Sequence, residues 1–181
     1  MKKILSVLLL LLLSISIYAQ QNVTKFLGIP VDGSKASMIQ KLKAKGFRYN
    51  AQIDKLEGTF NGEKVYVSIQ TNKNRVWRIA VTYKTPCDEG QIKIRYNNLC
   101  RQFESNTKYI ALETTQELSD DEDISYKMTV NHKQYEAIYF QLPREGIQNR
   151  IVWFTITEVF GEYHIVMYYE NNNNASHGED L

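Results

Sequence analysis

A dense series of short segments, in which β-branched and aromatic residues alternate with polar ones, constrains the fold of this chain most strongly. In residues 64–70, for example, Val65, Val67 and Ile69 fall on one side of an extended chain. Such alternation predicts antiparallel strands with one buried face and one partly solvated face. Runs of this kind cover residues 56–60, 64–70, 75–84, 108–117, 124–131, 134–142, 150–158 and 162–170.

Two other segments have helical periodicity. In residues 34–45, Met38 and Leu42 form part of an apolar stripe. Gly33 or Ser34 can cap the start of this helix, and Gly46 follows as a helix stop. A second helix is predicted over residues 85–104, with Thr85 as its N-cap and Pro86 at its first position. The helical spacing of its apolar residues runs through Ile92, Tyr96, Leu99 and Phe103.

The order of these segments predicts an α+β fold. Each half of the chain has one helix followed by a meander of strands, and Asn61-Gly62 is a strong hairpin signal in the first half. Val76-Trp77 in the first half and Val152-Trp153 in the second suggest an internal duplication. We therefore expect two tandem units, residues 24–84 and 85–170, that share one antiparallel sheet with both helices on one face.

With this organisation the chain resembles the β-lactamase-inhibitor-like fold family. Residues 26–33 and 38–47 also resemble uncharacterised exported proteins of Gram-negative gut-type bacteria. The family resemblance covers most of residues 24–170 and lies in the architecture. It implies an exposed sheet face that grips a partner protein, and we transfer no binding residue from it.

The N-terminus has the layout of a secretory signal peptide. Lys2 and Lys3 precede a long apolar run, and Ala19 ends the segment as the expected cleavage site. An uncleaved anchor is the alternative, although the apolar run is short for a membrane span of about 20 residues. The expected location is periplasmic or secreted. Cleavage would leave a domain at residues 20–170 and a polar, flexible tail at residues 171–181.

Charge excludes some classes of partner. The chain has 22 Lys and Arg against 20 Asp and Glu, and the leader contributes two of these cations and no acid. The mature chain is therefore charge-balanced, so neither nucleic acid nor an anionic membrane is an expected partner. After cleavage we expect no stable membrane span.

Few residues suggest catalysis, a metal or a cofactor. The three histidines lack metal-ligand spacing, and neither a G-x-S-x-G elbow nor a Gly-rich phosphate loop is present. Cys100 is expected to be buried beside Leu99. A disulfide with Cys87 would require Cys87 to lie outside the helix and fold back, because 13 helical positions span about 20 Å. The acidic run at residues 120–123 is interpreted as a solvated loop, with a Ca²⁺ site as the alternative.

The aromatic residues carry the functional prediction. The chain has 12 Tyr, 7 Phe and 2 Trp, and several of them alternate along strands. They can serve as sheet core, or they can line an exposed face that binds a protein or glycan. The candidate binding residues for such a face are Tyr66, Arg78, Tyr135, Tyr139 and Trp153.

The leading hypothesis is an exported, non-catalytic module that binds a protein of the cell envelope. Two alternatives come from other classes: a small hydrolase or modifying enzyme with a deep pocket, and a structural or folding accessory of the envelope.

Overall fold

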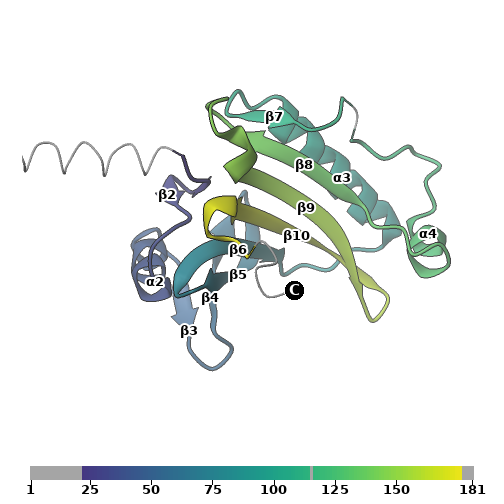
Figure 1. The fold of residues 1–181 in the computed structure, drawn as a ribbon. Coiled ribbons are helices and arrows are strands. Elements are labelled where there is room, and N and C mark those ends of the chain that lie inside the picture. The colour runs from purple at the N-terminus through teal and green to yellow at the C-terminus, as the bar shows by residue number, and fades with distance from the viewer. Residues whose placement is uncertain (1–21, 115, 177–181) are drawn as a thin grey trace, which may run out of the picture.

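One antiparallel sheet of eight strands dominates the computed structural model, which describes residues 22–114 and 116–176. The strand order is β3-β4-β5-β6-β10-β9-β8-β7, and a separate two-stranded ribbon pairs β1 with β2. The fold is therefore mixed α+β and rich in strands (Figure 1). The predicted signal peptide lies outside the described residues. Within them, none of the helices is long and apolar enough to span a bilayer.

Strands of the first half of the chain occupy one side of the sheet, and those of the second half occupy the other. The first half contains β1 (Lys25–Phe26), β2 (Ile29–Pro30), α2 (Lys35–Ala44), β3 (Arg48–Asn50), β4 (Lys55–Phe60), β5 (Glu63–Asn72) and β6 (Arg75–Tyr83). The second half contains α3 (Glu89–Glu104), β7 (Tyr109–Ala111), α4 (Ile124–Thr129), β8 (Glu136–Gln141), η1 (Ile147–Asn149), β9 (Arg150–Val159), β10 (Glu162–Asn171) and η2 (Asn172–Asn174).

The two halves join where β6 pairs with β10 in the middle of the sheet. In both halves a helix precedes four sheet strands, with α4 inserted between β7 and β8. The short sequence matches do not follow this order, however. Val76-Trp77 lies in the central strand β6, whereas Val152-Trp153 lies in β9, one strand away from the joint.

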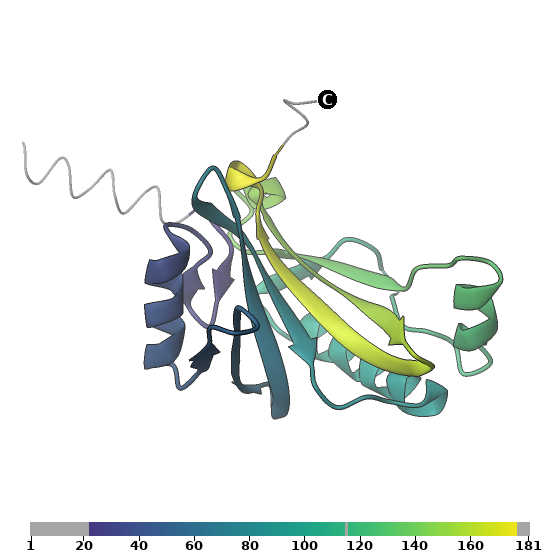
Figure 2. The ribbon, with the colours of Figure 1, turned by 90° about the horizontal axis from the view of Figure 1, so that it is seen from below.

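Both long helices pack on the same face of the sheet, which we call the core face. One row of in-register residues crosses six strands of this face, and all of its side chains are buried: Leu56, Val67, Val81, Met167, Phe154 and Ala137. Met38 and Leu42 of α2 and Phe103 of α3 belong to the same hydrophobic cluster. Figure 2 shows the helices on one side of the twisted sheet. The opposite face, which we call the open face, carries no helix in the described part of the chain.

The local signals around α2 and the first hairpin are confirmed. The Ser34 side chain caps α2 by accepting a hydrogen bond from the Ser37 amide, and Gly46 has φ +94° after its end. Asn61 and Gly62 both have positive φ between β4 and β5, as a two-residue hairpin requires.

The predicted start of the second helix is wrong. Its N-cap is Asp88, not Thr85, and Asp88 forms a capping box with Gln91. Cys87 consequently lies before the helix, where its backbone exchanges two hydrogen bonds of 2.9 Å with Tyr163. Cys87 and Cys100 are both buried and both free, so this position of Cys87 does not lead to a disulfide.

Two of the predicted strands in the second half are also corrected. The segment predicted at 124–131 is the helix α4, and the strand predicted at 108–117 shrinks to the three residues of β7. Asp123 caps α4 by accepting a 2.8 Å hydrogen bond from the Tyr126 amide, and Glu89 accepts one of 2.8 Å from the Ile124 amide. These carboxylates bind backbone amides that a strand would donate to a neighbouring strand.

The start of the polar segment predicted as a flexible tail belongs to the fold, because Asn171 is the last residue of β10 and Asn172–Asn174 form η2. Asn171 is fully buried, and its side-chain amide donates to the Val31 carbonyl at 2.9 Å. The Asn174 side chain likewise donates to the Val76 carbonyl at 2.9 Å. The segment therefore fastens the end of β10 to the first half of the chain.

Candidate functional site

The candidate site lies on the open face, where in-register residues of neighbouring strands form rows. The middle row runs from β5 to β8 through Ser68, Ala80, Tyr168, Trp153 and Ile138. The next row runs through Gln70, Arg78, Glu170, Ile151 and Phe140. Most of these side chains are half-buried, as expected for a sheet face that no helix covers in the described part.

A bulge in β6 brings a second tryptophan to this face. Thr71 pairs with Val76 and Gln70 pairs with Arg78, so Trp77 is the extra residue of the bulge. Val76 is fully buried in the core, whereas Trp77 is half-buried and outside the core cluster. Simple alternation would have placed Trp77 beside Ile79 on the core face.

The centre of the open face is the Arg78 cluster, which we define as Trp77, Arg78, Trp153, Tyr168 and Glu170. The rings of Trp153 and Tyr168 stack with centroids 4.2 Å apart. The Arg78 guanidinium carbon lies 4.1 Å from the Trp77 ring centroid and 5.0 Å from that of Tyr168. The cluster therefore alternates aromatic rings with a planar cation, an arrangement stabilised by cation–π attraction.

The buried Glu170 side chain bonds two other members of this cluster. Its carboxylate accepts a 2.8 Å hydrogen bond from Trp153 Nε1 and forms a 2.6 Å ion pair with Arg78 Nη2. The Glu170 residue is 8% exposed, so both interactions are largely shielded from water. One buried carboxylate thus fixes the orientation of the indole and the guanidinium above it.

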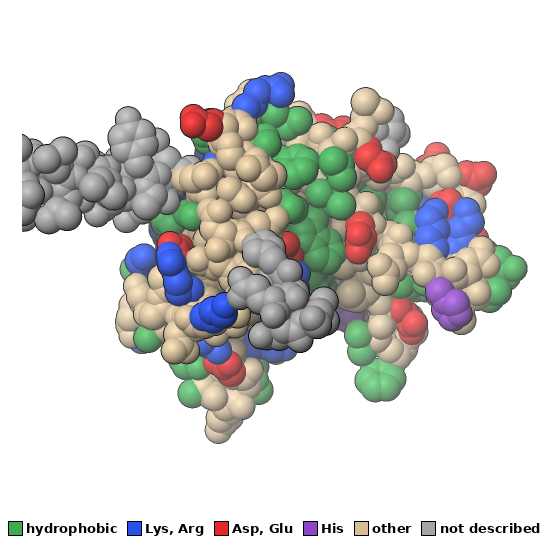
Figure 3. Space-filling model, viewed as in Figure 1, with side chains coloured by type: hydrophobic (Ala, Val, Ile, Leu, Met, Phe, Trp, Pro, Cys, Tyr) green, Lys and Arg blue, Asp and Glu red, His purple; other side chains and the backbone are tan. Residues whose placement is uncertain are grey.

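Hydrophobic side chains gather around the cluster, as the middle of the space-filling view shows (Figure 3). Ile138, Phe140, Ile151 and Val166 are half-buried residues of β8, β9 and β10 on this face. At the other side of the joint, Lys84 lies 3.9 Å from the Tyr66 ring centroid and pairs with Glu57 at 2.7 Å. The open face therefore combines an apolar centre with a charged margin.

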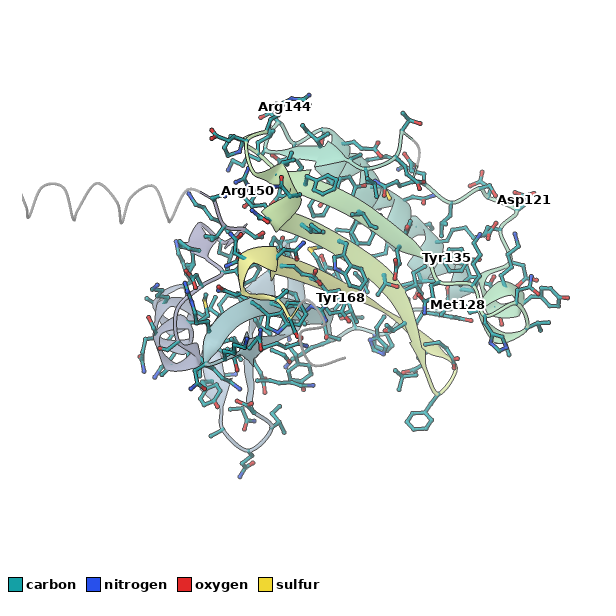
Figure 4. The ribbon with its side chains drawn as sticks, viewed as in Figure 1. Asp121, Met128, Tyr135, Arg144, Arg150 and Tyr168 are labelled. Atoms are coloured by element: carbon teal, nitrogen blue, oxygen red, sulfur yellow. The ribbon has the colours of Figure 1, made fainter. Side chains whose placement is uncertain are left out.

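The structure places three of the five predicted binding residues on one face and brings two of them, Arg78 and Trp153, together in the Arg78 cluster. Tyr66, Arg78 and Trp153 lie on the open face, and their roles in binding stay predictions. The placement of Tyr135 and Tyr139 on an exposed face is wrong, because they are 2% and 0% exposed on the core face. Tyr139 stacks on Phe103 of α3 with centroids 4.5 Å apart. In Figure 4, Tyr135 lies near α4, away from Tyr168 on β10.

Sequence reasoning missed Trp77, Tyr168 and Glu170 as members of the site. Tyr168 had a usable signal, because adjacent residues of a strand must point to opposite faces and Tyr169 follows it. Glu170 had none, since an acidic residue at the end of a predicted strand is ordinarily solvated. Trp77 depended on the bulge, which alternation does not reveal.

Comparisons with known proteins do not assign this chain to a family. No protein-family model matches the sequence, and searches of curated proteins and of solved structures also find no match.

The acidic run at residues 120–123 takes part in a hydrogen-bond network beside α4. Glu122 accepts hydrogen bonds of 2.6 Å from both Lys133 and the Tyr135 hydroxyl, and one of 3.0 Å from Lys127. No group of three or more His, Cys, Asp or Glu residues that could hold a metal occurs among the described residues.

The hydrogen bonds of Glu122 lead us to expect that the free energy of unfolding depends on pH in the acid range. Hydrogen bonds from Lys133, Tyr135 and Lys127 lower its pKa from the usual 4.5 to about 2. A carboxyl whose pKa is lowered by folding stabilises the protein above its unfolded pKa, and this contribution disappears as pH falls through the folded pKa. We expect Glu122→Gln to reduce the free energy of unfolding at pH 7 and to have almost no effect below pH 2.

Urea unfolding of the wild type and Glu122→Gln at pH 7, 4 and 2 measures this difference. The difference between the two proteins should shrink between about pH 5 and pH 2, the interval set by the two pKa values. A difference that is constant over the series would contradict the assignment. Asp120→Asn is the matched control, because the exposed Asp120 side chain lies in the same run and accepts none of the hydrogen bonds that Glu122 accepts.

A separate cleft lies on the core-face side of the molecule, between α3 and the β1–β2 ribbon. Its volume is about 1110 Å³, and Met167 and Tyr169 of β10 lie among its lining residues. Leu99 and Phe103 contribute from α3, and Phe60 contributes from the end of β4. The cleft is distinct from the Arg78 cluster, because Met167 and Tyr169 alternate with Tyr168 along β10.

Cys100 and His164 lie in surroundings that fix their protonation or their tautomer. Burial raises the pKa of the Cys100 thiol to about 11, so the thiol is protonated at neutral pH. His164 Nδ1 lies 3.1 Å from the Tyr83 carbonyl oxygen, which favours the tautomer protonated at Nδ1. Neither residue is among those that line the cleft.

Proposed function

We propose that this protein is an exported, non-catalytic binding module that engages a protein of the cell envelope through its open face. The observation that carries the proposal is the Arg78 cluster, in which two tryptophans, a tyrosine and an arginine are held by Glu170 on a sheet face that no helix of residues 22–114 and 116–176 covers. Export is inferred from the signal-peptide layout of residues 1–19.

The chemistry of the cluster favours a protein partner. Trp, Tyr and Arg are the residues most enriched among those that dominate binding energy at protein interfaces. Because Glu170 already fixes Arg78 and Trp153, little side-chain entropy remains to be lost on binding.

The arrangement of the fold supports a duplicated origin for this module. We propose that residues 24–84 and 85–170 are two helix-plus-meander units of the β-lactamase-inhibitor-like kind, joined at β6 and β10. The support is the order of elements and the position of both helices on the core face. The same architecture leaves the opposite face available to a partner.

Site-specific cross-linking tests the proposed function. A photoreactive benzoylphenylalanine at Thr155, a half-buried open-face position next to the cluster, should form a discrete protein adduct in the envelope of the native cells. The same group at Gln40, an exposed position of α2, is the matched control. We expect at least about five-fold more adduct from Thr155, because interface energy concentrates in a few central residues.

A second variant links the adduct to the open face. Tyr66→Glu places an acid on this face without touching the core, and it should reduce the Thr155 adduct while leaving thermal unfolding nearly unchanged. Equal adducts from Thr155 and Gln40, or none from Thr155, would refute the proposed binding face.

A further inference from the structure

We propose that the cleft between α3 and the β1–β2 ribbon binds a single-chain amphiphile that has an anionic head and an apolar tail. This site is separate from the open face, and the proposal does not depend on protein binding there. Three properties of the cleft carry it: its size and preformed walls, its apolar interior, and the sign of its charged residues.

The cleft is large enough for a small molecule, and side-chain hydrogen bonds hold its walls in place. Its volume of about 1110 Å³ compares with roughly 300–1,000 Å³ for typical ligand pockets. Asn61 Nδ2 in the β4–β5 turn donates to Gln102 Oε1 in α3 at 2.7 Å. The Gln141 side chain bonds both the amide and the carbonyl of Lys25, at 2.7 and 3.1 Å, and so ties β8 to β1.

The apolar part of the lining comes from both halves of the chain. Leu99 and Phe103 of α3 face the cleft from one side, and Phe60 at the end of β4 faces it from the other. Met167 and Tyr169 of β10 also line it, and both side chains are nearly fully buried. These buried side chains form the floor, whereas Leu27 is 37% exposed and Phe60 and Tyr109 are half-buried, so an alkyl tail would replace water against these three. This is favourable in proportion to the apolar area covered.

The charged residues that line the cleft all have one sign. Lys25, Lys108 and Arg150 contribute cations, and no Asp or Glu is among the lining residues of the described structure. Lys25 and Lys108 are exposed, whereas Arg150 is 1% exposed. Arg150 lies at the start of β9, beside the loop that carries Arg144 (Figure 4). A cleft with cations of this kind favours an anionic head over a cationic one.

The arginine also shapes the end of the cleft. Arg150 Nε donates to the Gln141 carbonyl and Nη2 donates to the Glu145 carbonyl, both at 2.8 Å, and Nη1 donates to Asn22 Oδ1 at 2.7 Å. These bonds hold the β8–β9 loop and the chain before β1 in one place. The lysines, which have no such structural role, are therefore the residues to vary.

Isothermal titration calorimetry with three defined probes tests the inference, each used below its critical micelle concentration. Dodecanoate should bind with one-to-one stoichiometry. Dodecyltrimethylammonium, which has the same tail length and a cationic head, and butyrate, which lacks the tail, should bind at least ten-fold more weakly. Dodecyl phosphate distinguishes the kind of head group. Binding equal to that of dodecanoate indicates a general anionic site, weaker binding indicates a site selective for carboxylate, and both results support the proposal.

Variants then place the binding in the cleft. Lys25→Gln/Lys108→Gln should weaken dodecanoate binding about five- to ten-fold, as expected for the loss of two exposed charge interactions. Lys41→Gln/Lys43→Gln on exposed positions of α2 changes the net charge equally and should leave binding unchanged. Thr107→Trp, which fills space at an exposed lining position in the loop before β7, should weaken binding without changing charge.

Several results would overturn the inference. These are no binding of dodecanoate to the wild type, equal binding of dodecyltrimethylammonium, or equal weakening by the cleft and control lysine pairs. Thermal unfolding of each variant confirms that it is folded before titration. Because all variants lie away from Thr155 and Tyr66, failure here leaves the cross-linking test of the open face unaffected.

Discussion

Replacing Phe154 by alanine is expected to lower the free energy of unfolding by about 3–5 kcal/mol, the range for a fully buried aromatic residue. Phe154 is 0% exposed in β9 and lies at the meeting point of sheet and helix. Its ring centroid is 5.0 Å from that of Tyr96 and 5.8 Å from that of Phe103, both in α3. The substitution removes these contacts and leaves a cavity that the surrounding strands cannot fill.

Phe160 provides a matched control, because the same substitution removes the same atoms from a solvent-exposed position. It is 101% exposed at the turn between β9 and β10, so Phe160→Ala should change stability by less than about 0.5 kcal/mol. Urea unfolding measures both variants, and Phe154→Ala should also lower the melting temperature by on the order of 10 °C. Similar values for the two variants would contradict the described core.

The elements predicted best were those determined by signals within a few residues. Asn-Gly specifies a tight hairpin because both residues tolerate positive φ, and Ser34 and Gly46 set the ends of α2 through capping and chain reversal. The long alternating runs in β5, β9 and β10 were predictable for the same reason. Each contains enough period-two residues to exclude a helix.

The segment of α4 shows where local patterns mislead. Ile124, Tyr126, Met128 and Val130 alternate as in a strand, yet Tyr126 and Val130 are exposed and only Ile124 is fully buried. The helix depends on the cap from Asp123 and on the amide contact with Glu89, which is 35 residues earlier in the chain. A partner so distant in sequence leaves no local signal.

The site was only partly predictable, because alternation does not say which face of a strand the helices cover. Tyr139 pairs in register with Val152 and so faces α3, while Trp153, the next residue of β9, faces the open side. A shift of one residue exchanges the two faces of a strand. The bulge at Trp77 has the same consequence within β6, and it becomes visible only when β5 and β6 are paired.

The second large effect on the free energy of unfolding is expected at the Arg78–Glu170 ion pair of the open face. The ion pair of Arg78 and Glu170 joins side chains that are 24% and 11% exposed. Removing one partner of such a pair leaves the other charge poorly solvated. We expect Arg78→Met to lower the free energy of unfolding by about 2–3 kcal/mol and Glu170→Gln to lower it by about 1–2 kcal/mol.

The order of these effects follows from burial. Arg78→Met leaves a carboxylate that is almost inaccessible to water, with Trp153 Nε1 as its remaining side-chain donor. Glu170→Gln leaves a more exposed guanidinium, and the new amide can still accept the indole hydrogen bond. Arg78→Met, which leaves the carboxylate uncompensated, should therefore be the less stable of the two variants.

A double-mutant cycle separates the pair from the packing around it. Arg78→Met/Glu170→Gln contains neither charge, so it should be less destabilised than the sum of the single variants by about 1–3 kcal/mol. Additive effects in urea unfolding would show that the two side chains are uncoupled and would remove the proposed role of Glu170 in fixing the cluster. Because the methionine keeps an apolar stem against Trp77 and Tyr168, the cycle reports on charge and hydrogen bonding more than on lost volume.

If Glu170 does preorganise the face, Glu170→Gln should also weaken the Thr155 cross-link more than its loss of stability accounts for, since a looser cluster loses more side-chain freedom on binding.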